Sequence, residues 1–185
     1  MACNIKTVTR ACGTALLTGT EDFIYLIPQS EVEAFPAVVS GTDPGDSKTL
    51  DEAWDLVSTV GLGYWRKIPV LIDTGQQTNT LEGQVGGRMI RQRAIGFIPG
   101  NDATIVELID TLLKCDGCLI AMTPNKDGNH HVLGNLTNGV YLEVIEGGSG
   151  GDRVGYNFTL QANTGVTTFI YPTTLGIDIT PTPTP

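Results

Sequence analysis

The spacing of apolar residues allows one long helix in this sequence. Between residues 102 and 114 apolar side chains recur at i, i+3, i+4 and i+7, which places them on one helix face. Asn101 or Asp102 can cap the first turn, and Lys114 suits the negative end of the helix dipole. Because this is the one clear helical period, most of the core must come from strands. The apolar residues of the predicted helix are Ile105, Leu108, Ile109 and Leu112.

Short apolar runs between turn residues predict these strands. Pro28 stops the first run, Pro69 places the second at a sheet edge or a bulge, and Gly86-Gly87 predicts a kink or bulge in the third. The dipeptide Asp127-Gly128 is a strong hairpin signal. The expected strands are residues 23–27, 64–73, 84–97, 118–123, 132–134, 140–145, 154–162 and 167–171.

The order of the elements indicates a mainly β fold with one α-helix. Two strands, the helix and then an antiparallel meander predict an antiparallel β-sandwich or barrel with the helix packed on it. The 185 residues suit one compact domain. We expect residues 1–62 to form an N-terminal arm whose strand and loops pack on the body. Residues 63–172 are expected to form the core, and residues 173–185 an extended Thr/Pro-rich tail.

Three segments outside the expected strands have distinct predictions. Residues 40–47 contain nearly every residue type that makes turns, which indicates an exposed loop. A short helix is expected next, capped by Thr49 or Asp51 and running through Asp55. Residues 74–83 are polar, uncharged apart from Glu82 and too long for a tight turn, so they predict a β-ribbon arm that leaves the body.

Charge is distributed in three blocks. Residues 1–60 carry nine acids and three bases, residues 61–100 two and five, and residues 101–185 nine and three, for a net charge of −9. Such an acidic chain is not expected to grip nucleic acid. The basic block is either a solvated face or a self-complementary surface between copies. The second interpretation predicts a subunit interface made of Arg88, Arg91 and Arg93, with Gln76, Gln77 and Asn79 of the arm.

The composition points to a soluble, turn-rich protein. Glycine makes up 23 of the 185 residues, which favours turns and strands. No apolar run approaches the ~18–20 residues that span a bilayer. The first residues lack the features of a secretory signal, so we expect synthesis in the cytoplasm.

The four cysteines could form a redox pair or a zinc site, or could be thiols without such a role. Cys115 and Cys118 have the spacing of redox and zinc sites. The pair follows a helix, whose negative end should raise the thiol pKa, so redox chemistry is not favoured. A zinc site would need two further ligands, and the spacing of Cys3 and Cys12 departs from the usual pattern. Thiols without such a role are therefore the favoured interpretation.

No catalytic site is predicted. His130 and His131 are the only histidines, and we interpret them as turn residues beside Asp127-Gly128. Residues 147–152 are rich in glycine but lead into a strand, whereas a phosphate-binding loop opens a helix. The triplets that begin at Asn135 and Asn157 match the glycosylation pattern, which carries little weight without a secretory signal.

Six segments of the sequence carry strand, helix and hairpin signals that together suggest a known class of protein. They are Gly96-Phe97-Ile98-Pro99-Gly100-Asn101, Ile105 to Leu113, Asn125-Lys126-Asp127-Gly128-Asn129, Val132-Leu133-Gly134, Gly151-Asp152-Arg153-Val154-Gly155-Tyr156 and the opening Met1-Ala2-Cys3-Asn4-Ile5. Through these segments the stretch from Leu81 to Ala162 resembles tail-tube and related virion structural proteins of tailed bacteriophages. The resemblance implies a β-sandwich or barrel with one flanking helix, assembled as hexameric rings. Such rings stack into a hollow tube whose channel is lined by strands of adjacent subunits.

The resemblance leads to an expected function as a tail-tube subunit, a structural virion protein and not an enzyme. Its expected partners are copies of itself and other virion tail or connector proteins, and DNA is expected to pass without specific binding. We expect no cofactor, metal or membrane partner, and a location in the virion tail. The alternatives are a head-to-tail connector or collar ring, a small metal-binding or ligand-binding β module and, last, a hydrolase.

Overall fold

A computed structural model describes residues 21–41, 46–71, 75–125, 129–148 and 154–181. Within these ranges the protein is mainly β, with one helix, α1 (Ala103–Lys114). Three 3-10 turns are η1 (Gln29–Glu31), η2 (Asp46–Lys48) and η3 (Thr173–Leu175). The strands are β1 (Phe23–Pro28), β2 (Val32–Ala34), β3 (Asp55–Leu56), β4 (Arg66–Pro69), β5 (Gln76–Glu82), β6 (Met89–Pro99), β7 (Leu119–Pro124), β8 (Asn129–Leu133), β9 (Tyr141–Gly148), β10 (Gly155–Thr164) and β11 (Phe169–Pro172).

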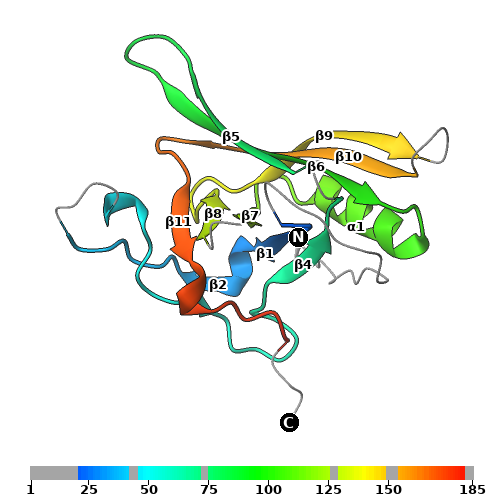
Figure 1. Cartoon of the computed structure of the whole chain (residues 1–185), viewed down its shortest axis with the longest axis horizontal. Coiled ribbons are helices and arrows are strands. Elements are labelled where there is room, and N and C mark those ends of the chain that lie inside the picture. Colours follow the sequence, from blue (N-terminus) through cyan, green and yellow to red (C-terminus); the bar gives the residue numbers. More distant parts are fainter. Residues whose placement is uncertain (1–20, 42–45, 72–74, 126–128, 149–153, 182–185) are drawn as a thin grey trace.

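The strands form two large antiparallel sheets and a small ribbon. The orders are β11-β8-β7-β1-β4 and β5-β6-β10-β9, and β2 pairs with β3. Figure 1 shows the four-stranded sheet above the five-stranded one, with α1 beside them at one end. The expected mainly β fold is confirmed, and the described strands close no barrel. A single meander is wrong, because the chain leaves the five-stranded sheet after β8, forms the β9–β10 hairpin in the other sheet and returns as β11.

Helix α1 forms as predicted and closes one end of the main core. The Asp102 side chain caps it, with Oδ1 accepting hydrogen bonds from the amides of Thr104 (2.9 Å) and Ile105 (3.1 Å). The predicted apolar face is buried. It packs with side chains from both sheets, among them Leu26, Ile68, Leu119, Ile98, Leu160 and Ala162.

The five-stranded sheet is buried on its other face by aromatic residues. Trp54 and Trp65 meet edge to face, with ring centroids 5.0 Å apart. Burial raises the pKa of Tyr171, and its hydroxyl donates a hydrogen bond of 2.7 Å to the Gly176 carbonyl. The Trp65 amide donates to the Asp178 carbonyl at 2.8 Å. The first part of the predicted tail therefore packs on the body, and residues 182–185 lie outside the described ranges.

The predicted helix ending at Asp55 is wrong. Thr49 and Leu50 form isolated bridges with Ile170 and Val38, and Asp55 begins β3. Leu50 is fully buried against the aromatic cluster, so tertiary packing holds this segment extended. The predicted arm, residues 1–62, also contributes β1 to the interior of the five-stranded sheet, between β7 and β4.

The predicted β-ribbon arm is a hairpin of β5 and β6. Its strands pair from Gln76 opposite Ile95 to Glu82 opposite Met89. The second strand begins at Met89, not at residue 84, since Gly86-Gly87 lie in the turn and not in a bulge. Strand β4 lies at a sheet edge, as the position of Pro69 predicted.

A buried ion pair ties η1 to β4. The Arg66 and Glu31 side chains are 1% and 5% exposed and contact each other through two pairs of atoms, one of them Nη2 to Oε1 at 2.7 Å. The Gly63 amide donates to Glu31 Oε2 at 2.8 Å. Arg66 also lies over the Tyr64 ring, 4.0 Å from its centroid. The pair therefore fixes the segment between β3 and β4 against the start of β2.

Replacing Arg66 with Met should destabilise the fold by about 3–5 kcal/mol, because Glu31 would stay buried without its cation. The double variant Glu31→Leu/Arg66→Met should recover most of that loss. Urea denaturation measures both. Lys67→Met is the control, since Lys67 makes only a cation–π contact with Phe23, worth about 0.5–1 kcal/mol. A double variant no more stable than Arg66→Met would contradict the assignment.

Candidate interaction surface

The hairpin of β5 and β6 projects from the body and turns at glycines. Figure 1 shows its tip, residues 83–88, at the far end of the ribbon. Gly83 and Gly86 have φ of 93° and 97°, a region that favours glycine. A Cβ on Gly83 would also come within 2.6 Å of the Gly87 carbonyl oxygen. The local sequence therefore specifies a tight turn.

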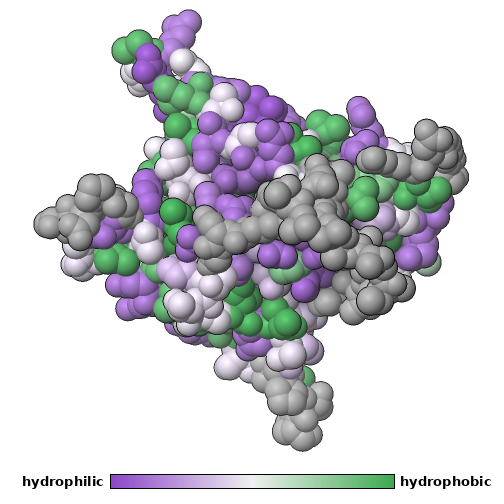
Figure 2. All heavy atoms as spheres, in the orientation of Figure 1, coloured by the Kyte–Doolittle hydropathy of each residue, from purple (hydrophilic) through white to green (hydrophobic). Residues whose placement is uncertain are grey.

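The end of this hairpin exposes apolar side chains. Val85 is 86% exposed, Leu81 55% and Met89 43%. Figure 2 shows hydrophobic surface at this projecting end. Arg88 is exposed beside them and makes no ion pair with any residue in the described ranges. We call residues 81–89 the hairpin end; it combines exposed apolar area with a cation that has no ion-pair partner among the described residues.

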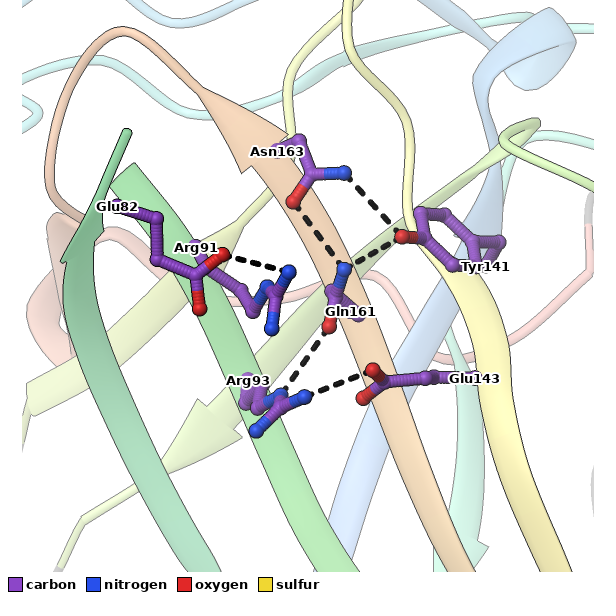
Figure 3. A network of polar contacts seen from close by, with 7 residues as sticks. All are labelled: Glu82, Arg91, Arg93, Tyr141, Glu143, Gln161 and Asn163. Carbon is purple, nitrogen blue, oxygen red and sulfur yellow. Dashed lines mark hydrogen bonds and ion pairs between the residues drawn. The ribbon is translucent and has the colours of Figure 1, made fainter. Parts of the chain in front are cut away.

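The outer face of the four-stranded sheet is polar. We call this surface the outer sheet face. Gln161 lies at its centre and is only 2% exposed, because neighbouring side chains cover it. Its Oε1 accepts from Arg93 Nε at 3.1 Å, and its Nε2 donates to the Tyr141 hydroxyl at 2.5 Å and to Asn163 Oδ1 at 3.1 Å. Figure 3 shows this network running across β6, β10 and β9.

Both arginines of the outer sheet face are ion-paired within the chain. Arg91 Nη2 lies 2.6 Å from Glu82 Oε2 on β5, and Arg93 Nη2 lies 2.7 Å from Glu143 Oε1 on β9 (Figure 3). The four side chains are 26–32% exposed. Each arginine therefore already has a carboxylate partner within its own chain. The predicted contact of these arginines with acids of a neighbouring copy stays a prediction.

The polar residues of the arm divide between its two faces. Gln76 is exposed on the same side as Arg91 and Arg93. Gln77 and Asn79 point to the opposite side, where their amides donate to Thr168 Oγ1 at 3.3 and 3.2 Å. These two residues hold the base of the hairpin to the connection between β10 and β11.

Cys115 and Cys118 do not form a redox pair with each other. The interpretation of the cysteines as thiols is wrong for Cys115, which is buried and disulfide-bonded. It is confirmed for Cys118, a free thiol whose pKa is raised, chiefly by burial. Cys3 and Cys12 lie outside the described residues. The part of the chain that the structure describes holds no group of three or more His, Cys, Asp or Glu side chains arranged for a metal ion.

The predicted turn position of the histidines is wrong. Both lie in β8, because the strand begins at Asn129 and pairs with β7 and β11. His130 is buried and stacks on Tyr171, with ring centroids 6.5 Å apart. It is therefore a core residue on the aromatic face of the sheet.

The glycine-rich segment ends β9 and precedes β10. Gly147 and Gly148 belong to β9, and residues 149–152 lie outside the described ranges. A strand follows, as predicted, so the helix of a phosphate-binding loop is missing from that position. No described helix is long and apolar enough to cross a membrane.

The chain matches no protein-family model, no curated protein and no solved structure.

Replacing Gln161 with Leu should cost about 1–3 kcal/mol of stability, because it removes the partner of Arg93 Nε and one partner of the Tyr141 hydroxyl. Thermal or urea unfolding measures this loss. Gln76→Leu, an exposed change on the same sheet face, should stay within about 0.5 kcal/mol of wild type. Equal effects of the two substitutions would show that the network adds no stability.

Proposed function

We propose that this protein is a structural subunit of a phage tail tube, which assembles through contacts between copies into stacked rings around a channel for DNA. The resemblance of residues 81–162 suggests this class of protein. The observation that carries the proposal is the hairpin end. It leaves Val85 almost fully exposed at the end of a projecting ribbon, beside Arg88, which has no ion pair within the part of the chain that the structure describes.

The hairpin end is suited to contact a second copy. Isolated monomers gain nothing by exposing apolar side chains on a projecting ribbon, and such exposed patches mark interaction sites. The acidic blocks, residues 1–60 and 101–185, supply carboxylates that complement Arg88. A contact between a hairpin and a different surface of the next copy is heterologous, and such contacts generate rings or open stacks.

The charge of the outer sheet face suits a wall along which DNA passes. The outward positions of its four strands carry two arginines and three glutamates. Such a face offers no excess positive charge, so it gains little from counterion release when phosphates approach. This is compatible with passage without specific binding.

Replacing Val85 with Asp should weaken assembly and leave the monomer fold intact. Burying a valine at an interface is worth about 1.5–3 kcal/mol, so the concentration needed for assembly should rise by at least about tenfold. Electron microscopy and sedimentation velocity measure assembly, and circular dichroism measures the fold. Val106→Asp on the exposed face of α1 is the matched control, since Val106 is 41% exposed.

Three outcomes are decisive for this proposal. A wild-type protein that stays monomeric at high concentration, with no ring, tube or virion location, would overturn the proposed function. Normal tubes formed by the Val85→Asp variant would support the proposed function but would show that the hairpin end makes no essential contact in the tube. One ring per particle, in place of many stacked copies, would indicate a connector or collar.

A further inference from the structure

We propose that Arg91 and Arg93 form a latent polyanion-binding site on the outer sheet face, which the carboxylates of Glu82 and Glu143 hold closed. The inference rests on the proposed function in one respect, namely that a nucleic acid lies along this face. That acids of the same chain close the site follows from the two ion pairs alone and does not depend on the proposed function.

The two arginines are placed as a phosphate-binding pair would be. They are separated by one residue on β6 and therefore project from the same face, about 6–7 Å apart along the strand. A guanidinium presents a planar fork of donors that fits phosphate oxygens. Both side chains are partly exposed, at 28% and 32%, so a ligand can reach them from solvent.

Two carboxylates on different strands occupy these forks. Glu82 is the last residue of β5, and Glu143 lies on β9 beside a register irregularity opposite Thr159 and Leu160. Figure 3 shows them reaching the arginines from opposite sides of β6. The acids therefore come from strands on either flank, and each arginine has its own.

Glu82 and Glu143 oppose phosphate binding mainly by their negative charge, and less by the strength of their ion pairs with the arginines. An ion pair open to solvent contributes only about 0–1 kcal/mol, so a phosphate could exchange with one carboxylate if the surrounding charge favoured it. The displaced carboxylate would then stand beside the phosphate and repel it. Affinity for a polyanion comes from cations that neutralise its phosphates and release counterions. In the wild-type protein the glutamates already neutralise the arginines, so the face gains little from binding.

The nearest outward positions add no further cation. Thr78 and Thr80 face the arginines from β5, and Asn163 lies opposite Arg91 on β10. Glu146, two rows further along β9, adds an acid. Removing the two paired carboxylates is therefore the smallest change that gives the face a positive charge.

The test measures binding of a fluorescein-labelled DNA duplex of about 20 base pairs by fluorescence polarisation. Wild type should not bind. The isosteric double variant Glu82→Gln/Glu143→Gln should bind, and because two phosphates are neutralised its affinity should fall about tenfold between 50 and 200 mM salt. Adding Arg91→Gln and Arg93→Gln should abolish that binding.

The control has the same change of net charge elsewhere. Glu33→Gln/Glu52→Gln removes two exposed acids, one in β2 and one in the segment before β3, both on the other side of the five-stranded sheet, and should not bind. If the main double variant misfolds by circular dichroism, Glu143→Gln/Glu146→Gln is used, which also gives the face a positive charge but frees Arg93 alone, so it should bind with about half the salt dependence.

Three results would overturn the inference: wild-type binding that depends on the arginines, no binding by the folded Glu→Gln variants, or equal binding by the control. Wild-type assembly, measured separately by electron microscopy, reports on the proposed function. A failure of either idea is therefore distinguishable from a failure of the other.

Discussion

The five-stranded sheet must be covered on both faces, and the course of the rest of the chain follows from this constraint. All six residues of β7 are buried, although neighbouring side chains point to opposite sides. One side is covered by the four-stranded sheet and α1, the other by the aromatic cluster. The long excursion between β1 and β4 and the segment after β11 supply that second cover. The buried pair of Arg66 and Glu31 anchors it.

The four-stranded sheet has a different role because only one of its faces is buried. Its strands alternate between core residues such as Ala94 and Leu160 and outward polar residues such as Arg93 and Gln161. Outward side chains there bond to one another across strands, so the face is ordered without a covering layer. The same sheet extends into the projecting hairpin. The polar outer sheet face and the projecting hairpin are thus parts of one continuous β structure.

Local patterns in the sequence predicted the elements but not their long-range partners. Helix α1 and the strands from β6 onward were found because periodicity and turn residues act over a few positions. The segment around Leu50 was misassigned because packing against distant aromatic residues holds it extended. Alternation alone puts Arg91 and Arg93 on one face. Their pairing with Glu82 and Glu143 depends on the register of four strands, including an irregularity between β9 and β10, and no local signal specifies it.

The hydrogen bonds between Trp65 and Asp178 and between Tyr171 and Gly176 have a consequence for the order of folding during synthesis. The residues after β11 leave the ribosome later than every strand that they cover. Until then the nascent chain can pair its central strands but leaves its aromatic side open to water and to chaperones. The segment after β11 thus closes the aromatic side of the sheet, and the fold is complete only after translation has passed this segment.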